Sequence, residues 1–300
     1  MDQFLDLARR GKNEWWRYLI SWSLIVSVVV GANVLLVLLV LIPQLMRSGQ
    51  EFNLANLEPL TVLAASLIPF VFLFGLMWGV ARLIHQRPFL TLITPARGFN
   101  WRRFGQGGLI WGILIAVTCL VEALLYPGRY QLQFKPIPFL QFLPLILVLI
   151  PFQTSAEELV FRGYLLQGLS LLTKKTFIPV ILSSVFFMLL HLANPEVASS
   201  PLLTSAYYLG TGLFLSILTI RDNRMELALG VHLATNLFVS LFVNAKNSAL
   251  QTPAVFMTAE IDPVYNLVSF LAAAGLFYLI IFKLLRREET TPTNAPVENG

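Results

Sequence analysis

The segment Thr154-Ser-Ala-Glu-Glu-Leu-Val-Phe-Arg-Gly-Tyr164 places three ionisable side chains inside an otherwise apolar stretch of the chain. They are Glu157, Glu158 and Arg162. An ionised side chain at the centre of a bilayer costs about 2.5–3.5 kcal/mol, even on the most lenient insertion scales. Three of them on one spanning helix therefore indicate a function that outweighs this cost, and chemistry is the leading candidate.

The composition of the 300-residue chain is typical of an integral membrane protein. Hydrophobic residues make up 56% and charged residues only 12%, with a mean hydropathy of +0.72. A soluble domain carries about 25% charged residues, and a spanning helix needs about 20 mainly apolar residues. The sequence therefore predicts an all-α, polytopic bundle of about eight membrane helices, at 16–43, 58–83, 107–126, 138–172, 177–192, 201–220, 226–244 and 264–284.

The positive charges predict how this bundle is oriented. With the N-terminus inside, 16 of the 21 lysines and arginines fall in inner segments and four in outer segments, and Arg162 alone lies within a span. Such an excess in short loops marks the cytoplasmic side. We therefore expect a multi-pass protein with both termini in the cytoplasm, in the plasma membrane of a prokaryote. The net charge of +5 needs no nucleic-acid partner, and the single cysteine, Cys119, excludes an internal disulfide.

The sequence divides into a membrane-embedded core between two polar ends. The first end mixes charged and apolar positions, which indicates a segment at the cytoplasmic interface. The last end is polar and contains prolines, which indicates disorder. The predicted parts are an interfacial segment at 1–14, three helices at 15–137 with a cytoplasmic loop at 84–106, a core with the polar motifs at 138–244, a last helix at 245–287 and a disordered tail at 288–300.

The first polar motif is Glu157-Glu158-x-x-x-Arg162 on the fourth predicted helix. Glu158 and Arg162 are four residues apart, so they share one helix face and can pair. Glu157 is turned about 100° from that face, because the helix has 3.6 residues per turn. It is therefore free to face another helix. A structural ion pair beside a polar hinge is the alternative interpretation of this motif.

Two further motifs repeat the spacing of four residues. Phe187-x-x-x-His191 ends the fifth predicted helix, and His232-x-x-x-Asn236 lies in the seventh. Taken singly, His191 is interpretable as an interfacial residue, and His232 with Asn236 as hydrogen-bonding contacts between helices. Together with the first motif they supply the base and the oxyanion donors that peptide hydrolysis needs. No serine or cysteine lies in a recognisable nucleophile motif, so attack by water is favoured.

The three motifs, in this order and on separate helices, resemble those of the CPBP family of intramembrane proteases. That family includes the type II CAAX prenyl endopeptidases and the bacteriocin-processing and immunity proteins of bacteria. The resemblance covers roughly residues 140–243, and no motif residue departs from the family pattern.

The resemblance implies a role for each motif residue. Glu157 and His191 would activate the attacking water. His232 and Asn236 would stabilise the tetrahedral oxyanion. The residues that would support the first carboxylate and pack beneath the first imidazole are Glu158, Arg162 and Phe187.

Two versions of the mechanism remain open. In the favoured version Glu157 is itself the base, and no cofactor is required. In the other, Glu157, His191 and His232 hold Zn²⁺ with an open position for water. Glu158 would then have to act as the base, although its spacing commits it to Arg162.

The depths of these residues set a condition on the fold. At about 1.5 Å per residue from the inner charges, Glu157 and His191 lie about 25 Å into the membrane and His232 about 12 Å. They can meet only if helices tilt, or if the fourth and fifth helices project beyond the inner surface.

The sequence therefore predicts an intramembrane endopeptidase whose partners are the lipid bilayer and a membrane-associated peptide or protein. A prenylated CAAX-type substrate is implied by the resemblance alone, and a leader peptide is equally compatible. A non-catalytic scaffold or immunity protein of the same family is the alternative. A proton-coupled transporter is less favoured, because the sequence has no internal repeat.

Overall fold

The computed structural model describes residues 3–38, 42–43 and 58–285. Its α-helices are α1 (Gln3–Asp6), α2 (Trp15–Leu36), α4 (Pro59–Gly79), α5 (Trp101–Leu125), α6 (Pro136–Glu158), α7 (Gln167–Ser170), α8 (Phe177–His191), α9 (Pro201–Asp222), α10 (Glu226–Leu241) and α11 (Pro263–Leu279). Three π-helical segments continue or join them, at Val80–Ile84, Leu159–Leu166 and Ile280–Leu284. Three short 3₁₀ turns lie at Leu7–Arg10, Phe89–Leu92 and Pro195–Ser199.

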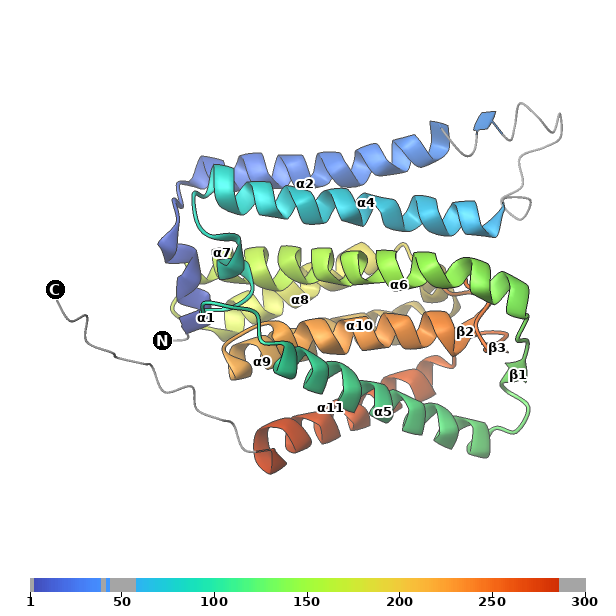
Figure 1. The fold of residues 1–300 in the computed structure, drawn as a ribbon. Helices are drawn as coiled ribbons and strands as arrows, with labels where there is room; N and C mark the ends of the chain where they lie inside the picture. Colours follow the sequence, from blue (N-terminus) through green and yellow to red (C-terminus); the bar gives the residue numbers. More distant parts are fainter. Residues whose placement is uncertain (1–2, 39–41, 44–57, 286–300) are drawn as a thin grey trace, which may run out of the picture.

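These helices confirm the all-α, polytopic fold. Six helical stretches in the described part are long and apolar enough to cross a membrane, and α8 and α10 are shorter apolar helices. Figure 1 shows α2 and α4 together on one side of the bundle and α5 and α11 on the other, with α6 and α10 between them. The predicted tail at 288–300 and residues 39–41 of the first predicted span lie outside the described residues.

The third membrane helix begins earlier than predicted, at Trp101 rather than at residue 107. Asn100 caps it, since its side chain accepts a hydrogen bond from the Arg103 amide at 3.0 Å. The Asn100 amide in turn donates to Glu226 at 3.1 Å. An asparagine before a helix is a strong start signal, and it shortens the loop expected at 84–106.

Helix α10 lies against α5 at very short range. A Cβ atom on Gly107 of α5 would lie only 2.5 Å from the Leu227 carbonyl oxygen, and one on Gly230 of α10 would overlap the Phe104 carbonyl. Small residues at such crossings let two backbones approach closely in a membrane. This contact fixes α10, which carries His232.

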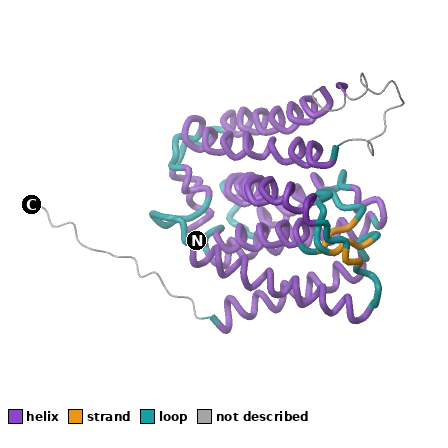
Figure 2. Tube along the Cα trace, turned by 45° about the vertical axis from the view of Figure 1, so that its right-hand side comes forward, coloured by secondary structure: helices purple, strands orange, loops and turns teal. Residues whose placement is uncertain are grey.

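A small sheet, which the sequence did not predict, closes one end of the bundle. Strands β1 (Gln131–Leu132), β2 (Val243–Ala245) and β3 (Phe256–Thr258) pair in the order β1-β3-β2, with β3 antiparallel to β1 and parallel to β2. Figure 2 shows them at the end opposite the N-terminus. Strands of two or three residues are too short to leave a period-two pattern in the sequence.

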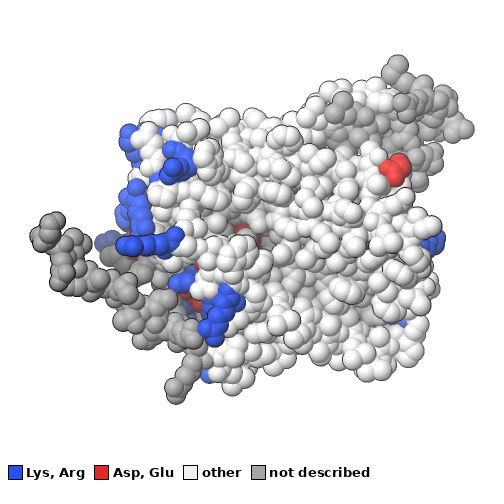
Figure 3. Space-filling view, in the orientation of Figure 1, with Lys and Arg blue, Asp and Glu red and all other residues white. Residues whose placement is uncertain are grey.

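The first described residues pack onto the protein at the other end. Phe4 is 0% exposed and Leu7 only 1%, and the Phe4 amide donates to the Asn223 side chain at 2.7 Å. The Lys12 amide donates to the His85 carbonyl, and the His85 ring contacts the Lys12 carbonyl in return. The segment expected at the interface therefore buries its apolar side chains against the bundle. Lysines and arginines gather at this same end (Figure 3).

Candidate active site

The first motif contains a buried ion pair, which lies where α6 runs into the π-helical segment that follows it. Arg162 Nη1 donates to Glu158 Oε1 at 2.7 Å, and both side chains are 0% exposed. The pairing expected from their spacing is confirmed. Arg162 Nη2 also donates to the Gly212 carbonyl on α9 at 3.2 Å, and its guanidinium lies 4.6 Å from the centre of the Phe187 ring. The pair thus ties α6 to α8 and α9.

His232 joins this ion pair, which the sequence did not indicate. Its Nδ1 lies 2.8 Å from Glu158 Oε1, and its Nε2 lies 3.6 Å from Glu157 Oε2. Because the Nδ1 partner is a carboxylate shared with Arg162, we infer that Nδ1 carries a proton and donates it. His232 therefore lies between the two carboxylates of the first motif.

The two carboxylate oxygens of Glu157 have different surroundings. Its Oε1 accepts a hydrogen bond from Gln153 Nε2 at 2.7 Å, whereas its buried Oε2 has no hydrogen-bond partner in the described structure. Gln153 is in turn held by Asn236 Nδ2, which donates to Gln153 Oε1 at 2.8 Å. Sequence reasoning missed Gln153. Its signal was its position four residues before Glu157 on the same apolar helix.

His191 is the last residue of α8. Its Nδ1 lies 2.7 Å from the Phe187 carbonyl oxygen, which can only accept, so Nδ1 carries the proton and Nε2 the lone pair. The Phe187 ring lies 4.3 Å from the imidazole, as expected, and the Tyr208 ring lies 4.6 Å away. Tyr208, on α9, is a second neighbour that the sequence did not identify. No ion pair joins His191 to Glu157 among the described residues.

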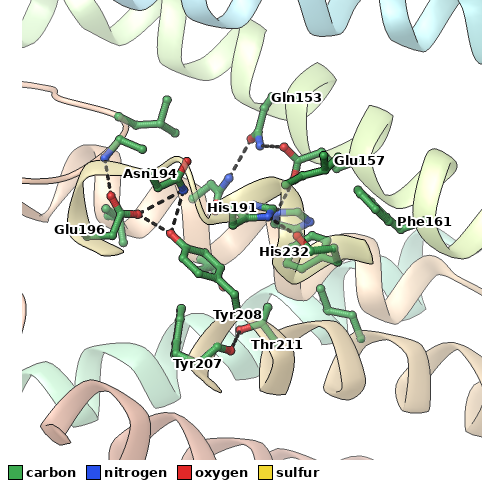
Figure 4. Close-up of a pocket in the computed structure, with 18 of the residues that line it drawn as sticks. Gln153, Glu157, Phe161, His191, Asn194, Glu196, Tyr207, Tyr208, Thr211 and His232 are labelled. Carbon is green, nitrogen blue, oxygen red and sulfur yellow. Dashed lines mark hydrogen bonds and ion pairs between the residues drawn. The ribbon is translucent and has the colours of Figure 1, made fainter. Parts of the chain in front are cut away.

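A cavity of about 810 Å³ brings these side chains together. Its polar lining includes Gln153, Glu157, His191, His232 and Asn236, and much of the remaining wall is apolar, including side chains of α2 and α4. Figure 4 shows Gln153 and Glu157 approaching the two histidines from α6. All four predicted catalytic residues line this cavity, and Phe187 does too.

The motif residues line one cavity, although the sequence placed them at different depths along their helices. The fourth predicted span is a continuous helix of 35 residues, Pro136–Ser170, and α8 and α10 are short. The end of the long helix at Gln167 is surrounded by protein, since Gln167 donates to the Thr91 carbonyl at 2.9 Å and accepts from Arg87 at 2.7 Å. A Cβ atom on Gly163 would lie 2.7 Å from the Leu92 carbonyl oxygen.

In the described part of the chain, these side chains are not arranged as a metal site. The described residues contain no group of three histidine, cysteine, aspartate or glutamate side chains arranged to hold one. The three proposed zinc ligands, Glu157, His191 and His232, line one cavity without forming such a group. We therefore derive no step through zinc.

Comparison with known proteins identifies the family. A family model described as type II CAAX prenyl endopeptidase, Rce1-like, matches residues 138–238. The uncharacterised protein YyaK of Bacillus subtilis (strain 168) is 32% identical over 261 residues, which cover 85% of this chain and 87% of the relative. The chain belongs to the Rce1-like family. No solved structure matches it.

The Rce1-like family is a family of CAAX-type intramembrane proteases, so this chain is an integral membrane protein of a protease family. The Rce1-like match begins just after the start of α6 and ends within α10. It therefore spans all three motifs and the polar cluster that they form around the cavity.

Proposed function

We propose that the protein is an intramembrane endopeptidase in which Glu157 and His191 activate water against a peptide bond. The observation that carries this proposal is the buried Glu157 Oε2, which accepts no hydrogen bond and lies in a cavity that it shares with the lone pair of His191 Nε2. Both atoms are proton acceptors, as general-base catalysis requires. Gln153 holds the other oxygen of Glu157 and so orients the carboxylate.

The reaction balances with these groups alone. The water oxygen bonds to the carbonyl carbon while its proton moves to Glu157, and the carbonyl oxygen becomes an oxyanion. The carbon–nitrogen bond then breaks, and the same proton moves to the leaving nitrogen.

His232 and Asn236 are proposed to hold the oxyanion. Asn236 Nδ2 has two protons and gives one to Gln153, which leaves one to donate. His232 donates its Nδ1 proton in a hydrogen bond to Glu158. Its Nε2 can therefore donate to the oxyanion only when both ring nitrogens are protonated. Glu158 and Arg162 serve to hold His232 in this position.

The cavity supports a substrate delivered through the membrane. Apolar side chains from α2 and α4 line one side of it, among them Trp22, Ile25 and Phe70. An apolar wall of this size favours a substrate with an apolar group beside the scissile bond. By its family this substrate would be of the CAAX type, and a leader peptide is an equally compatible candidate. The basic end of the bundle would face the cytoplasm.

The test is cleavage by the purified full-length protein in nanodiscs. The probes are a farnesylated CAAX peptide, the same peptide without the farnesyl group, and a bacterial leader peptide. We expect cleavage of at least one probe by the wild type, and none by Glu157→Ala or His191→Ala proteins that still insert and fold. Normal cleavage by both variants would show that the site is wrong. Full biological rescue by Glu157→Ala would instead favour a non-catalytic scaffold.

A further inference from the structure

We propose that Tyr208, anchored by Glu196, is a positioning residue for His191. This inference rests on the proposed catalytic role of His191, and neither residue belongs to the three motifs. It concerns how an imidazole at the very end of a helix is kept in one orientation and one tautomer.

The position of His191 leaves it in need of external support. It is the last residue of α8, and the chain turns away directly after it, so no further helical turn packs beside its ring. The ring instead contacts two aromatic rings from different helices. Phe187 on α8 is 4.3 Å away and Tyr208 on α9 is 4.6 Å away, each at an interplanar angle of 32°. Contacts with both rings restrict the rotation of the imidazole.

Tyr208 is itself anchored by the turn that follows His191. Its hydroxyl donates a short hydrogen bond to Glu196 Oε1 and accepts one from Asn194 Nδ2 at 2.9 Å. Glu196 is fixed in turn, because its Oε2 accepts from the Ala249 amide at 3.1 Å. Figure 4 shows Tyr208 reaching from α9 toward Glu196 and Asn194. The anchor thus joins three separate segments, α9, the turn at 194–199 and the loop after β2.

This arrangement serves the chemistry in two ways. It holds His191 so that Nδ1 bonds to the Phe187 carbonyl and Nε2 keeps its lone pair for the reaction. It also places an aromatic face beside a ring that becomes cationic whenever His191 takes up a proton, and such a cation is attracted to the face. The catalytic mechanism uses Glu196 for no other purpose. Its three hydrogen-bond donors among the described residues, Asn194, Tyr208 and Ala249, are all neutral, as expected for a carboxylate that serves as an anchor.

The first measurement is steady-state cleavage of whichever probe the wild type cleaves. We expect Y208L to lower kcat by about 10²-fold, because a misplaced catalytic group costs that much, with little change in KM. Y208F keeps the ring but loses the hydroxyl that Glu196 holds, so it is expected to lower kcat by less than Y208L and by at least as much as E196Q. E196Q should show a smaller fall in the same direction. Y278L removes a tyrosine of α11 outside the cavity and serves as the matched control.

The second measurement does not need activity. The chain has only three histidines, so ¹⁵N-histidine NMR of the full-length protein in nanodiscs can follow each ring, with His191 assigned by its loss in H191Q. We expect a single Nδ1-protonated His191 in the wild type, an average of tautomers in Y208L, and smaller changes in the same direction in Y208F and E196Q. If Y208L does not fold, the His191 signals of E196Q are compared with those of the wild type instead.

The outcomes separate the two proposals. An unchanged kcat in Y208L, beside an inactive Glu157→Ala protein, would overturn the positioning role and leave the proposed function intact. So would a fall in kcat with an unaltered His191 spectrum. If the wild type cleaves no probe, the proposed function fails, and the NMR spectra alone decide whether Tyr208 positions His191.

Discussion

The imidazole of His232 shares one carboxylate oxygen with a guanidinium: its Nδ1 lies 2.8 Å from Glu158 Oε1, the atom that also accepts from Arg162 at 2.7 Å. Glu158 and Arg162 are 0% exposed and His232 is 7% exposed. The pair that appears local in the sequence is therefore the anchor of a residue 74 positions away. Loss of either partner would affect both stability and the orientation of His232.

The first prediction concerns this buried pair. Arg162→Met leaves the Glu158 carboxylate without its guanidinium, and breaking a buried pair in this way costs about 3–5 kcal/mol. We expect a loss of stability of that size in reversible unfolding in detergent. The control is Arg221→Met at an exposed position, where we expect about 0.5 kcal/mol or less. The double variant Glu158→Met/Arg162→Met should be more stable than Arg162→Met alone, because it buries no unpaired charge. Equal stabilities of Arg162→Met and Arg221→Met would contradict the prediction.

The second prediction concerns Gln153. Gln153→Leu removes the donor that orients Glu157, so kcat should fall by as much as about 10²-fold while KM changes little. Gln133→Leu, at an exposed position beside β1, is the matched control and should behave as the wild type. A Gln153→Leu protein with full kcat would mean that Glu157 is positioned by other contacts.

The third prediction separates two roles of Asn236. It donates to Gln153, and we propose that it also donates to the oxyanion. Removing an oxyanion donor costs about 10²–10³-fold in kcat, so Asn236→Ala should lower kcat further in a Gln153→Leu background. A double-mutant cycle measures this coupling. If the second substitution has no effect there, Asn236 acts only through Gln153.

The fourth prediction concerns metal removal. Since the described residues form no three-ligand group, we expect cleavage to survive exhaustive treatment with a chelator, followed by elemental analysis of the same sample. Loss of activity that returns on addition of Zn²⁺ would show that the cavity rearranges to bind metal.

The fifth prediction concerns pH and His85, which directly follows the apolar helix Pro59–Ile84. Burial lowers the pKa of His85 below its ordinary value of 6.5, an effect opposed by its contact with the Lys12 backbone. The unfolded chain then binds a proton that the folded chain does not, so stability is greatest above pH 6.5 and falls as the pH drops below it. Unfolding measured from pH 7.5 to 5 should show this fall. The fall should be smaller in His85→Gln.

The helices and the first ion pair were predictable from the sequence because the information for them is local. Apolar runs of spanning length mark the membrane helices without regard to their neighbours. Asn100 held the signal for the early start of α5, although the apolar pattern alone placed it at residue 107. Glu158 and Arg162 lie one helical turn apart, so a local rule pairs them.

Only the tertiary structure decided which side chains each motif residue contacts. The sequence expected Glu157 to face His191, whereas the structure places its carboxylate 3.6 Å from His232 and ties it to Asn236 through Gln153. Tyr208 packs on His191 from a helix with no motif of its own. These contacts join residues on different helices, and their distances depend on how closely the helices pack. Glycine contacts such as Gly230 on Phe104 set that packing, and no spacing along one helix encodes it.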